Sequence, residues 1–183
     1  WVVVMSSPLA SPDKAHAAFT LQGRGHGLTK FAGSMEELMT IEAAITRIRA
    51  LIGDRCQVSA AVRDQHARDD SYFPAVRPDS VAFPRSTEEV SEIVKICADE
   101  GCPIVPWGTG TSLEGHSIPI RGGISLDMAE MNQVLAVHQE DMDAVVQPGV
   151  TREALNEDLR ATGLFFPVDP GANASLRGMA ATP

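Results

Sequence analysis

The feature that most constrains the fold is the stretch 103–115, PIVPWGTGTSLEG, where a short apolar run gives way to glycines and hydroxyl side chains. The run from Pro103 to Trp107 is brief and apolar, and it predicts a buried strand. Gly108 and Gly110 permit positive φ angles and close backbone approach, so successive N–H groups can point at one anion. The stretch therefore predicts an α/β domain with a binding site for a phosphate group, most naturally a diphosphate.

Two well-defined phosphate motifs do not match this loop. A dinucleotide Gly-x-Gly-x-x-Gly turn requires a third glycine where this chain has Leu113. A triphosphate loop would run from Gly110 to Ser117, but His116 replaces its lysine, and Pro119 disfavours the helix that must follow. From this stretch alone, a glycine-rich surface loop without a ligand remains the alternative.

Apolar spacing and capping residues predict the other elements. Ser34 and Glu37 form a capping box that begins a helix ending at Gly53, and residues 61–79 are polar without a period, which predicts a solvated loop. Residues 1–33 give no such signal and are expected to be a flexible tail. Further helices are predicted at 86–100 and 151–162, and strands at 80–83, 103–107, 123–126, 133–137, 144–147 and 164–168. This alternation predicts an α/β domain with a mixed sheet.

Composition excludes several classes of function. The formal net charge of −9 disfavours binding to nucleic acid or to anionic lipid through bulk charge. No apolar run is long enough to suggest a transmembrane segment. The histidines and cysteines show no metal-ligand spacing, so no metal site is predicted. Three cysteines without a C-x-x-C pair suit a reducing compartment, and a cytoplasmic location is expected.

Several motifs, in a consistent order between about residues 56 and 180, carry a family resemblance. They are the segments 60–66, 103–115, 122–127, 139–141, 145–151 and 166–176. Together they resemble the FAD-binding domain of the vanillyl-alcohol oxidase and p-cresol methylhydroxylase superfamily, and within it the D-lactate dehydrogenase and glycolate oxidase branch. The resemblance implies an α/β (α+β) mixed-sheet FAD-binding domain of the p-cresol methylhydroxylase (PCMH) type, truncated. Residues 80–183 would be its first part, and 34–79 a helix and lead-in, with the rest of the domain and the substrate domain absent.

The resemblance also implies the residues that bind the cofactor, FAD. Those expected around the FAD pyrophosphate are Pro106, Trp107, Gly108, Thr109, Gly110, Thr111, Ser112, Leu113 and Gly115. Those expected nearer the isoalloxazine are Pro148, Gly149, Asp169, Pro170 and Gly171, and Gly178 and Thr182 would begin the next cofactor-binding turn. From the residues alone, Asp169 before Pro-Gly is equally ordinary turn chemistry. No catalytic residue is expected in this chain.

The activity implied by the resemblance is oxidation of a D-2-hydroxy acid, foremost D-lactate to pyruvate. Its electrons would pass to a cytochrome or a quinone-linked carrier, and the location would be mitochondrial in a eukaryote. Glycolate and D-2-hydroxyglutarate are alternative substrates, and a non-catalytic flavin-binding remnant is the alternative from another class, because the chain alone is expected to be inactive.

One position departs from the resembled pattern. Relatives usually have Gly-Gly-Met-Ala-Ala-Thr where this chain has Arg177-Gly-Met-Ala-Ala-Thr followed by Pro183. Replacing a glycine at positive φ by arginine would cost about 1 kcal/mol or more, and the side chain would crowd the flavin. Arg177 is therefore expected to weaken FAD binding.

Overall fold

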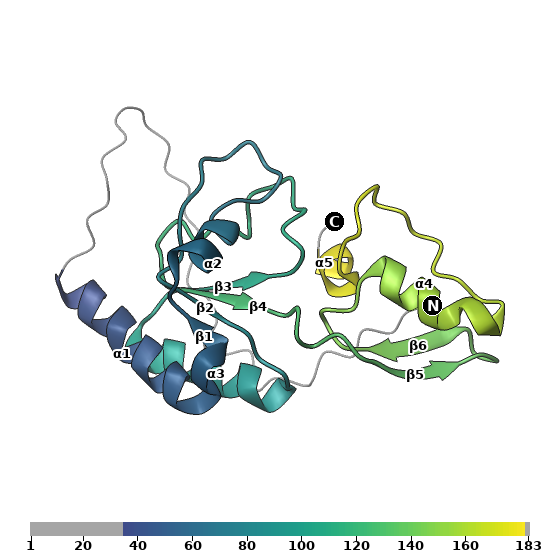
Figure 1. Cartoon of the computed structure of the whole chain (residues 1–183), viewed down its shortest axis with the longest axis horizontal. Helices are drawn as coiled ribbons and strands as arrows, with labels where there is room; N and C mark the ends of the chain where they lie inside the picture. Colours follow the sequence, from purple (N-terminus) through teal and green to yellow (C-terminus); the bar gives the residue numbers. More distant parts are fainter. Residues whose placement is uncertain (1–34, 182–183) are drawn as a thin grey trace, which may run out of the picture.

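The computed structural model describes residues 35–181, which form two lobes placed side by side (Figure 1). The larger lobe contains α1 (Met35–Ile52), β1 (Cys56–Gln57), α2 (Ala60–Gln65), β2 (Ser80–Ala82), α3 (Thr87–Glu100), β3 (Ile104–Trp107) and β4 (Ile124–Asp127). The smaller lobe contains β5 (Val134–His138), β6 (Asp143–Val146), α4 (Arg152–Leu159) and α5 (Leu176–Ala181). The predicted tail, the Ser34 cap and Thr182 lie outside the described residues.

The sheet of the larger lobe is mixed, as predicted. Its strand order is β1-β2-β4-β3, with β1 antiparallel to β2 and the other pairs parallel. Parallel neighbours require a long crossover, which is usually a helix. The crossover from β3 to β4 is instead residues 108–123, which contain no helix and include the glycine-rich loop. This topology places the loop at the carboxyl end of β3, the edge where ligands of open α/β sheets bind.

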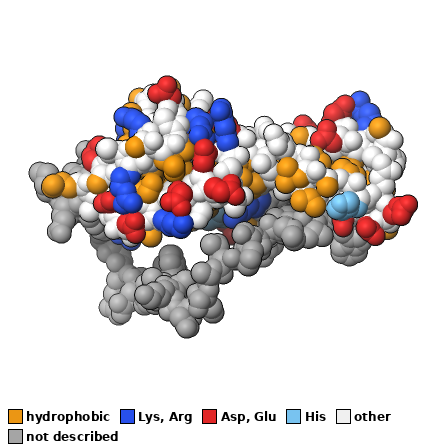
Figure 2. Space-filling model, turned by 90° about the horizontal axis from the view of Figure 1, so that it is seen from below, with side chains coloured by type: hydrophobic (Ala, Val, Ile, Leu, Met, Phe, Trp, Pro, Cys, Tyr) orange, Lys and Arg blue, Asp and Glu red, His pale blue; other side chains and the backbone are white. Residues whose placement is uncertain are grey.

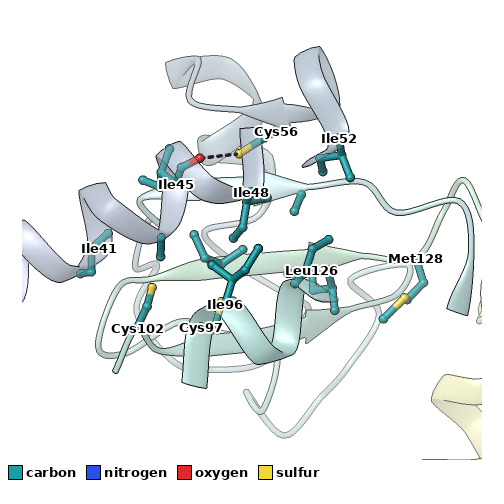
Figure 3. Close-up of a cluster of buried hydrophobic side chains, with 14 of the residues drawn as sticks. Ile41, Ile45, Ile48, Ile52, Cys56, Ile96, Cys97, Cys102, Leu126 and Met128 are labelled. Atoms are coloured by element: carbon teal, nitrogen blue, oxygen red, sulfur yellow. Dashed lines mark hydrogen bonds between the residues drawn. The ribbon is translucent and has the colours of Figure 1, made fainter. Parts of the chain in front are cut away.

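Two helices cover one face of this sheet and form its core (Figure 3). Isoleucines at three- and four-residue spacing on α1 meet α3 and the strands, so the amphipathic pattern read from the sequence is confirmed. The buried cluster comprises Ile41, Ala44, Ile45, Ile48, Ile52, Cys56, Ala82, Ile93, Ile96, Cys97, Cys102, Ile124, Leu126, Met128 and Met131. All three cysteines are buried as free thiols. The larger lobe therefore has a hydrophobic core of its own.

Charged side chains of both signs cover the outer side of these helices (Figure 2). Arg47 of α1 pairs with Asp99 and Glu100 at the end of α3, at 3.2 and 2.6 Å. Both terminal nitrogens of the Arg55 guanidinium, Nη1 and Nη2, donate to the Glu89 carboxylate at 2.6 Å, which lowers the pKa of Glu89 to about 2. The second pair, only partly exposed, fastens the chain before β1 to the start of α3.

The smaller lobe has a smaller sheet and a smaller hydrophobic core. Its sheet has only the antiparallel strands β5 and β6, and α4 packs on them. Its buried cluster is Ala144, Val150, Leu155, Leu159 and Leu176. A two-stranded sheet is marginally stable in isolation, so this lobe relies on its helices and on its contact with the larger lobe.

The helix signals in the sequence hold in the structure. The Ser86 hydroxyl accepts a hydrogen bond from the Glu89 N–H, and the Thr151 hydroxyl accepts one from Ala154. Gly101 and Gly163 adopt the left-handed conformation that ends the helical segments before them. The second half of the Ser86 capping box differs, because the Glu89 carboxylate accepts the Arg85 N–H instead.

Two strand predictions need correction. Residues 164–168 form no strand, because the Asn156 side chain of α4 takes the place of a neighbouring strand. It accepts from the Phe166 N–H at 2.7 Å and donates to the Phe166 carbonyl at 3.4 Å. The strand at 103–107 exists, but it is not buried throughout: β3 is an edge strand, Pro106 is exposed, and only Trp107 is buried.

The prediction of a solvated loop for residues 61–79 holds only in part, because much of the segment is irregular and exposed but not all of it. The segment begins with α2, and it buries the polar side chains of His66 and Asp69. Both are satisfied by partners far away in sequence, Asp127 and Ser117. The polar composition reflected internal hydrogen bonds that a local pattern cannot distinguish from solvation.

Candidate functional site

A cleft of about 410 Å³ lies between the two lobes. The carboxyl end of β3 and the glycine-rich loop form one wall, and the residues leading into α5, together with α5 itself, form the other. The lining residues are Pro106, Trp107, Gly108, Thr109, Gly110, Thr111, Ser112, Leu113, Glu114, His116, Ser117, Met128, Pro148, Pro170, Ala172, Ala174, Ser175, Arg177, Gly178, Met179 and Ala181. Cavities of this size are typical of small-molecule sites.

The loop presents unused backbone donors. Among the described residues, none accepts a hydrogen bond from the backbone N–H groups of residues 108–113. The Thr109 and Thr111 hydroxyls lie 3.1 Å apart, and the Ser112 hydroxyl accepts from the Glu114 N–H. Consecutive free N–H groups beside hydroxyls form an anion-binding concavity. The loop is therefore chemically suited to phosphate oxygens.

Residues 66–79, which we call the strap, hold the glycine-rich loop in place through hydrogen bonds. The Asp70 N–H donates to the Gly110 carbonyl at 3.2 Å, and the Ser117 hydroxyl donates to the Asp69 carboxylate at 2.6 Å. Burial would raise the pKa of Asp69, but hydrogen bonds from Ser117 and Ser71 outweigh it, so the pKa is lowered. Asp69 is thus an anchoring carboxylate. Ser117 is buried and hydrogen-bonded to Asp69, so its hydroxyl is engaged. No helix follows the loop either, so the structure also contradicts the triphosphate-loop interpretation.

Close contacts explain the glycines of the cleft. A Cβ on Gly108 would lie 2.8 Å from the Ser175 hydroxyl, and one on Gly110, at φ +73°, would lie 2.7 Å from the Trp107 ring. A Cβ on Gly149 would lie 2.1 Å from the Met128 carbonyl oxygen. A side chain at any of these positions would displace a wall of the cleft.

The ionisable residues in the lining are few. Glu114, His116 and Arg177 are all exposed, and the His116 Nδ1 lies 3.4 Å from the Ser112 hydroxyl. Arg177 pairs with none of the residues that the structure describes. The expected backbone strain at this position is wrong: Arg177 lies in α5, and Met142 is the non-glycine residue with positive φ in the described part of the chain.

The structure brings most of the predicted site residues to this cleft. Pro106, Trp107, Gly108, Thr109, Gly110, Thr111, Ser112, Leu113, Pro148, Pro170 and Gly178 line it. Gly149 lines an adjoining cavity of about 280 Å³ with Asn132 and Thr151. Gly115, Asp169 and Gly171 line neither: Gly115 packs against Phe73, and Asp169 accepts from the Gly171 N–H and pairs with Arg152. Contact of these residues with a cofactor stays a prediction.

Other residues of the cleft were not predicted from the sequence. Ser175 is buried where both walls meet, and its hydroxyl accepts from the Gly178 N–H at 3.3 Å. The backbone of residues 174–176 runs beside 150–152, since Arg152 donates to the Ala174 carbonyl and Leu176 to that of Val150. Ser175 lies within a recognised motif, but no spacing rule placed it opposite Gly108. Met128 and Met179 likewise carry no local signal.

Other classes of site find no candidate in the described part of the chain. No group of three or more His, Cys, Asp or Glu side chains is positioned there to hold a metal ion. None of the described helices has the length and apolar character needed to cross a membrane.

Comparisons with known proteins agree with this geometry. Residues 78–182 match the family model described as FAD binding domain. The chain is 52% identical over 143 residues to "Probable D-lactate dehydrogenase, mitochondrial" of Danio rerio, and 39% over 181 residues to "D-lactate dehydrogenase [cytochrome], mitochondrial" of Arabidopsis thaliana. It is 43% identical over 95 residues to "Glycolate oxidase subunit GlcD" of Bacillus subtilis. The solved structure of p-cresol methylhydroxylase with bound substrate superposes with a TM-score of 0.63 at 26% identity, over 73% of this chain and 26% of that one.

The matches cover unequal shares of the two partners. They span 78%, 95% and 52% of this chain for the three relatives in that order. The chain spans only 29%, 32% and 20% of the relatives' own lengths.

Proposed function

Given that this chain belongs to the family of FAD binding domains, we propose that it is the FAD-holding part of an enzyme that oxidises a D-2-hydroxy acid, foremost D-lactate to pyruvate. The observation that carries the proposal is that residues 108–113, whose backbone N–H groups have no acceptor among the described residues, line a cleft between two lobes. The names of the relatives supply the substrate class.

The residues present fit FAD by a test independent of those names. The cofactor's diphosphate is a bulky dianion, and a chain with net charge −9 must hold it through local donors. The N–H groups of residues 108–113 and the Thr109 and Thr111 hydroxyls provide such donors. Gly108 and Gly110 let the Ser175 hydroxyl and the Trp107 ring pack directly against the loop backbone, since a Cβ at either position would lie within 2.8 Å of them.

This fit indicates which part of the reaction FAD would perform and which part the protein would perform. FAD, when bound, supplies the two-electron acceptor, and the protein supplies binding and orientation. Oxidation removes a hydride from C2 of the hydroxy acid and a proton from its hydroxyl, and the electrons leave to a cytochrome or a quinone-linked carrier. In this proposal residues 106–113 hold the diphosphate, and Pro148 and Pro170, which line the same cleft, lie nearer the isoalloxazine. The group that accepts the hydroxyl proton has no candidate among the described residues.

Binding of FAD by the purified chain is the first test. We expect flavin fluorescence to be quenched on titration, and Gly110→Ala to weaken binding about tenfold or more by driving a Cβ into the Trp107 ring. Gly101→Ala is the matched control, because Gly101 has a similar positive φ, at +65°, with nothing within 4 Å of a Cβ. Wild-type protein that leaves flavin fluorescence unchanged would contradict the proposal.

Turnover distinguishes the substrates. Full-length protein containing this chain is to be assayed with a dye acceptor on D-lactate, glycolate and D-2-hydroxyglutarate, with L-lactate as control. We expect D-lactate to have the highest kcat/KM. If the protein binds FAD but oxidises none of these acids, it is a non-catalytic flavin-binding protein instead.

The relatives also bear on location. Because two of those named above are described as mitochondrial, we propose a mitochondrial location for the full-length protein, in place of the cytoplasmic one that cysteine content suggested. Fractionation of cells that express the tagged full-length protein tests this: recovery in the cytosol would contradict it.

A further inference from the structure

A buried polar pair lies beneath the cleft without lining it. His66 follows α2 and is almost fully buried, and Asp127 ends β4 with a side chain only 8% exposed. The His66 Nε2 and the Asp127 Oδ2 are 2.8 Å apart. Neither residue belongs to the cofactor contacts proposed above. The pair joins the strap to the central part of the sheet.

Hydrogen-bond directions fix how many protons this pair holds. The His66 Nδ1 lies 2.8 Å from the Val62 carbonyl, which only accepts, so Nδ1 carries a proton. A second proton must lie between Nε2 and the Asp127 carboxyl, whichever atom holds it. The other carboxyl oxygen, Oδ1, accepts from the Ala129 N–H at 2.8 Å. The pair is therefore neutral as a unit and held by three hydrogen bonds, which suits a buried site.

The His66 ring contacts a residue of the cleft. Its centroid lies 4.8 Å from that of the Trp107 ring, and the Phe83 ring lies nearly perpendicular to it with the centroids 5.9 Å apart. Trp107 in turn packs against Gly110, where even a Cβ would come within 2.7 Å of its ring. The contacts thus run without a break from Asp127 through His66 and Trp107 to the loop of residues 108–113, whose N–H groups have no acceptor in the described part of the chain.

We propose that the His66–Asp127 pair consists of positioning residues for the cofactor loop: it fixes the Trp107 ring, and the ring fixes the loop in the conformation that receives the FAD diphosphate. This inference rests on the proposed function. Preorganised donors bind more tightly because little order is lost on binding, and supporting residues behind the contact residues set that order. The hydrogen bonds at both ring nitrogens fix the orientation of the His66 ring, and the Trp107 ring packs against it.

The variants separate ring packing from hydrogen bonding. His66→Phe keeps a ring against Trp107 but leaves Asp127 without its partner. Asp127→Asn restores a bond, because its amide can donate to Nε2 of a neutral His66 while its oxygen still accepts from Ala129. Asp127→Ser is too short to reach His66 and serves if His66→Phe does not fold. Ile93→Ala, in the core on α3, is a control for lost stability alone.

Two readouts are measured on each variant: the FAD dissociation constant, and Trp107 fluorescence without cofactor in a Trp1→Phe background, where Trp107 is the remaining tryptophan. We expect His66→Phe and Asp127→Ser to weaken FAD binding about tenfold and to shift Trp107 emission, and Asp127→Asn to stay within about threefold of wild type. Ile93→Ala should lower the melting temperature without changing either readout.

The inference is overturned if His66→Phe or Asp127→Ser binds FAD as wild type does, or if Ile93→Ala weakens binding equally. If the wild type binds no FAD, the proposed function fails. Positioning of Trp107 is then judged by its cofactor-free emission: a shift in His66→Phe but not in Ile93→Ala supports it, and equal emission overturns it.

Discussion

The two lobes differ in how they are held together. The larger lobe packs two helices on a four-stranded sheet and buries fifteen clustered side chains, whereas the smaller lobe places a short helix on a two-stranded sheet with five. The loop with the free N–H groups belongs to the larger lobe, and the wall that faces it belongs to the smaller. The N–H groups that we propose to bind FAD thus belong to the lobe with the larger core, and the opposite wall belongs to a lobe that a bound ligand would stabilise.

Gly149, where the two lobes meet, should be the position least tolerant of substitution. In Gly149→Ala the new Cβ would meet the Met128 and Met131 carbonyl oxygens, both backbone atoms, so we expect a loss of about 4 kcal/mol or more of unfolding free energy. Gly163→Ala, in the smaller lobe, has φ +76° but open space, and should cost only about 1 kcal/mol. Urea denaturation of both variants measures the difference. Equal losses of unfolding free energy would mean that the backbone around Gly149 can move apart to admit a Cβ.

Core truncations test whether the lobes unfold together. Ile48 and Leu155 are both fully buried, one in each core, and replacement by alanine should cost about 3 kcal/mol locally in each case. We expect Ile48→Ala to lower amide-exchange protection in both lobes, because the smaller depends on the larger. Leu155→Ala should lower it in the smaller lobe alone, with the α1 amides as an internal control. Loss of protection in α1 on Leu155→Ala would show that the two lobes form one cooperative unit.

Acid should weaken the ion pair between Arg55 and Glu89 in the larger lobe. The pKa of Glu89 is about 2 in the folded protein against an ordinary 4.5, because Arg55 hydrogen-bonds its carboxylate. Its contribution, about 2–3 kcal/mol, is full above pH 4.5 and is lost as pH falls from 4.5 towards 2.

Glu89→Gln should therefore lower stability at neutral pH and flatten its dependence on pH in that window, as measured by urea denaturation at a series of pH values. The exposed Arg160–Glu157 pair of the smaller lobe provides the control: Glu157→Gln should change little. An acid dependence in Glu89→Gln identical to that of the wild type would refute the assignment.

The smallest expected effect concerns the charge that the smaller lobe contributes to the cleft. Arg177 is an unpaired cation within the described lining, so Arg177→Ala should weaken FAD binding about fivefold at low salt, and less at high salt. Arg160→Ala, an exposed arginine outside the lining, should leave affinity unchanged. Tighter binding by Arg177→Ala would instead support the crowding that the sequence suggested.

The sequence by itself determined the features that depend on neighbouring residues. Ser86 and Thr151 begin helices, Gly101 and Gly163 end them, and the glycines after Trp107 mark a loop suited to an anion, because capping and positive φ are local properties. The motifs shared with the resembled family predicted that the cofactor is FAD.

Tertiary structure decided what depends on residues distant in sequence. The burial of His66 and Asp69 in the strap was missed because their partners lie 61 and 48 positions away, and buried polar groups look like exposed ones until those partners are known. The missing strand at 164–168 has the same cause, since Asn156 supplies its hydrogen bonds. The placement of Ser175 and Arg177 opposite the loop required the two lobes to meet, and no periodicity within either lobe encodes that meeting.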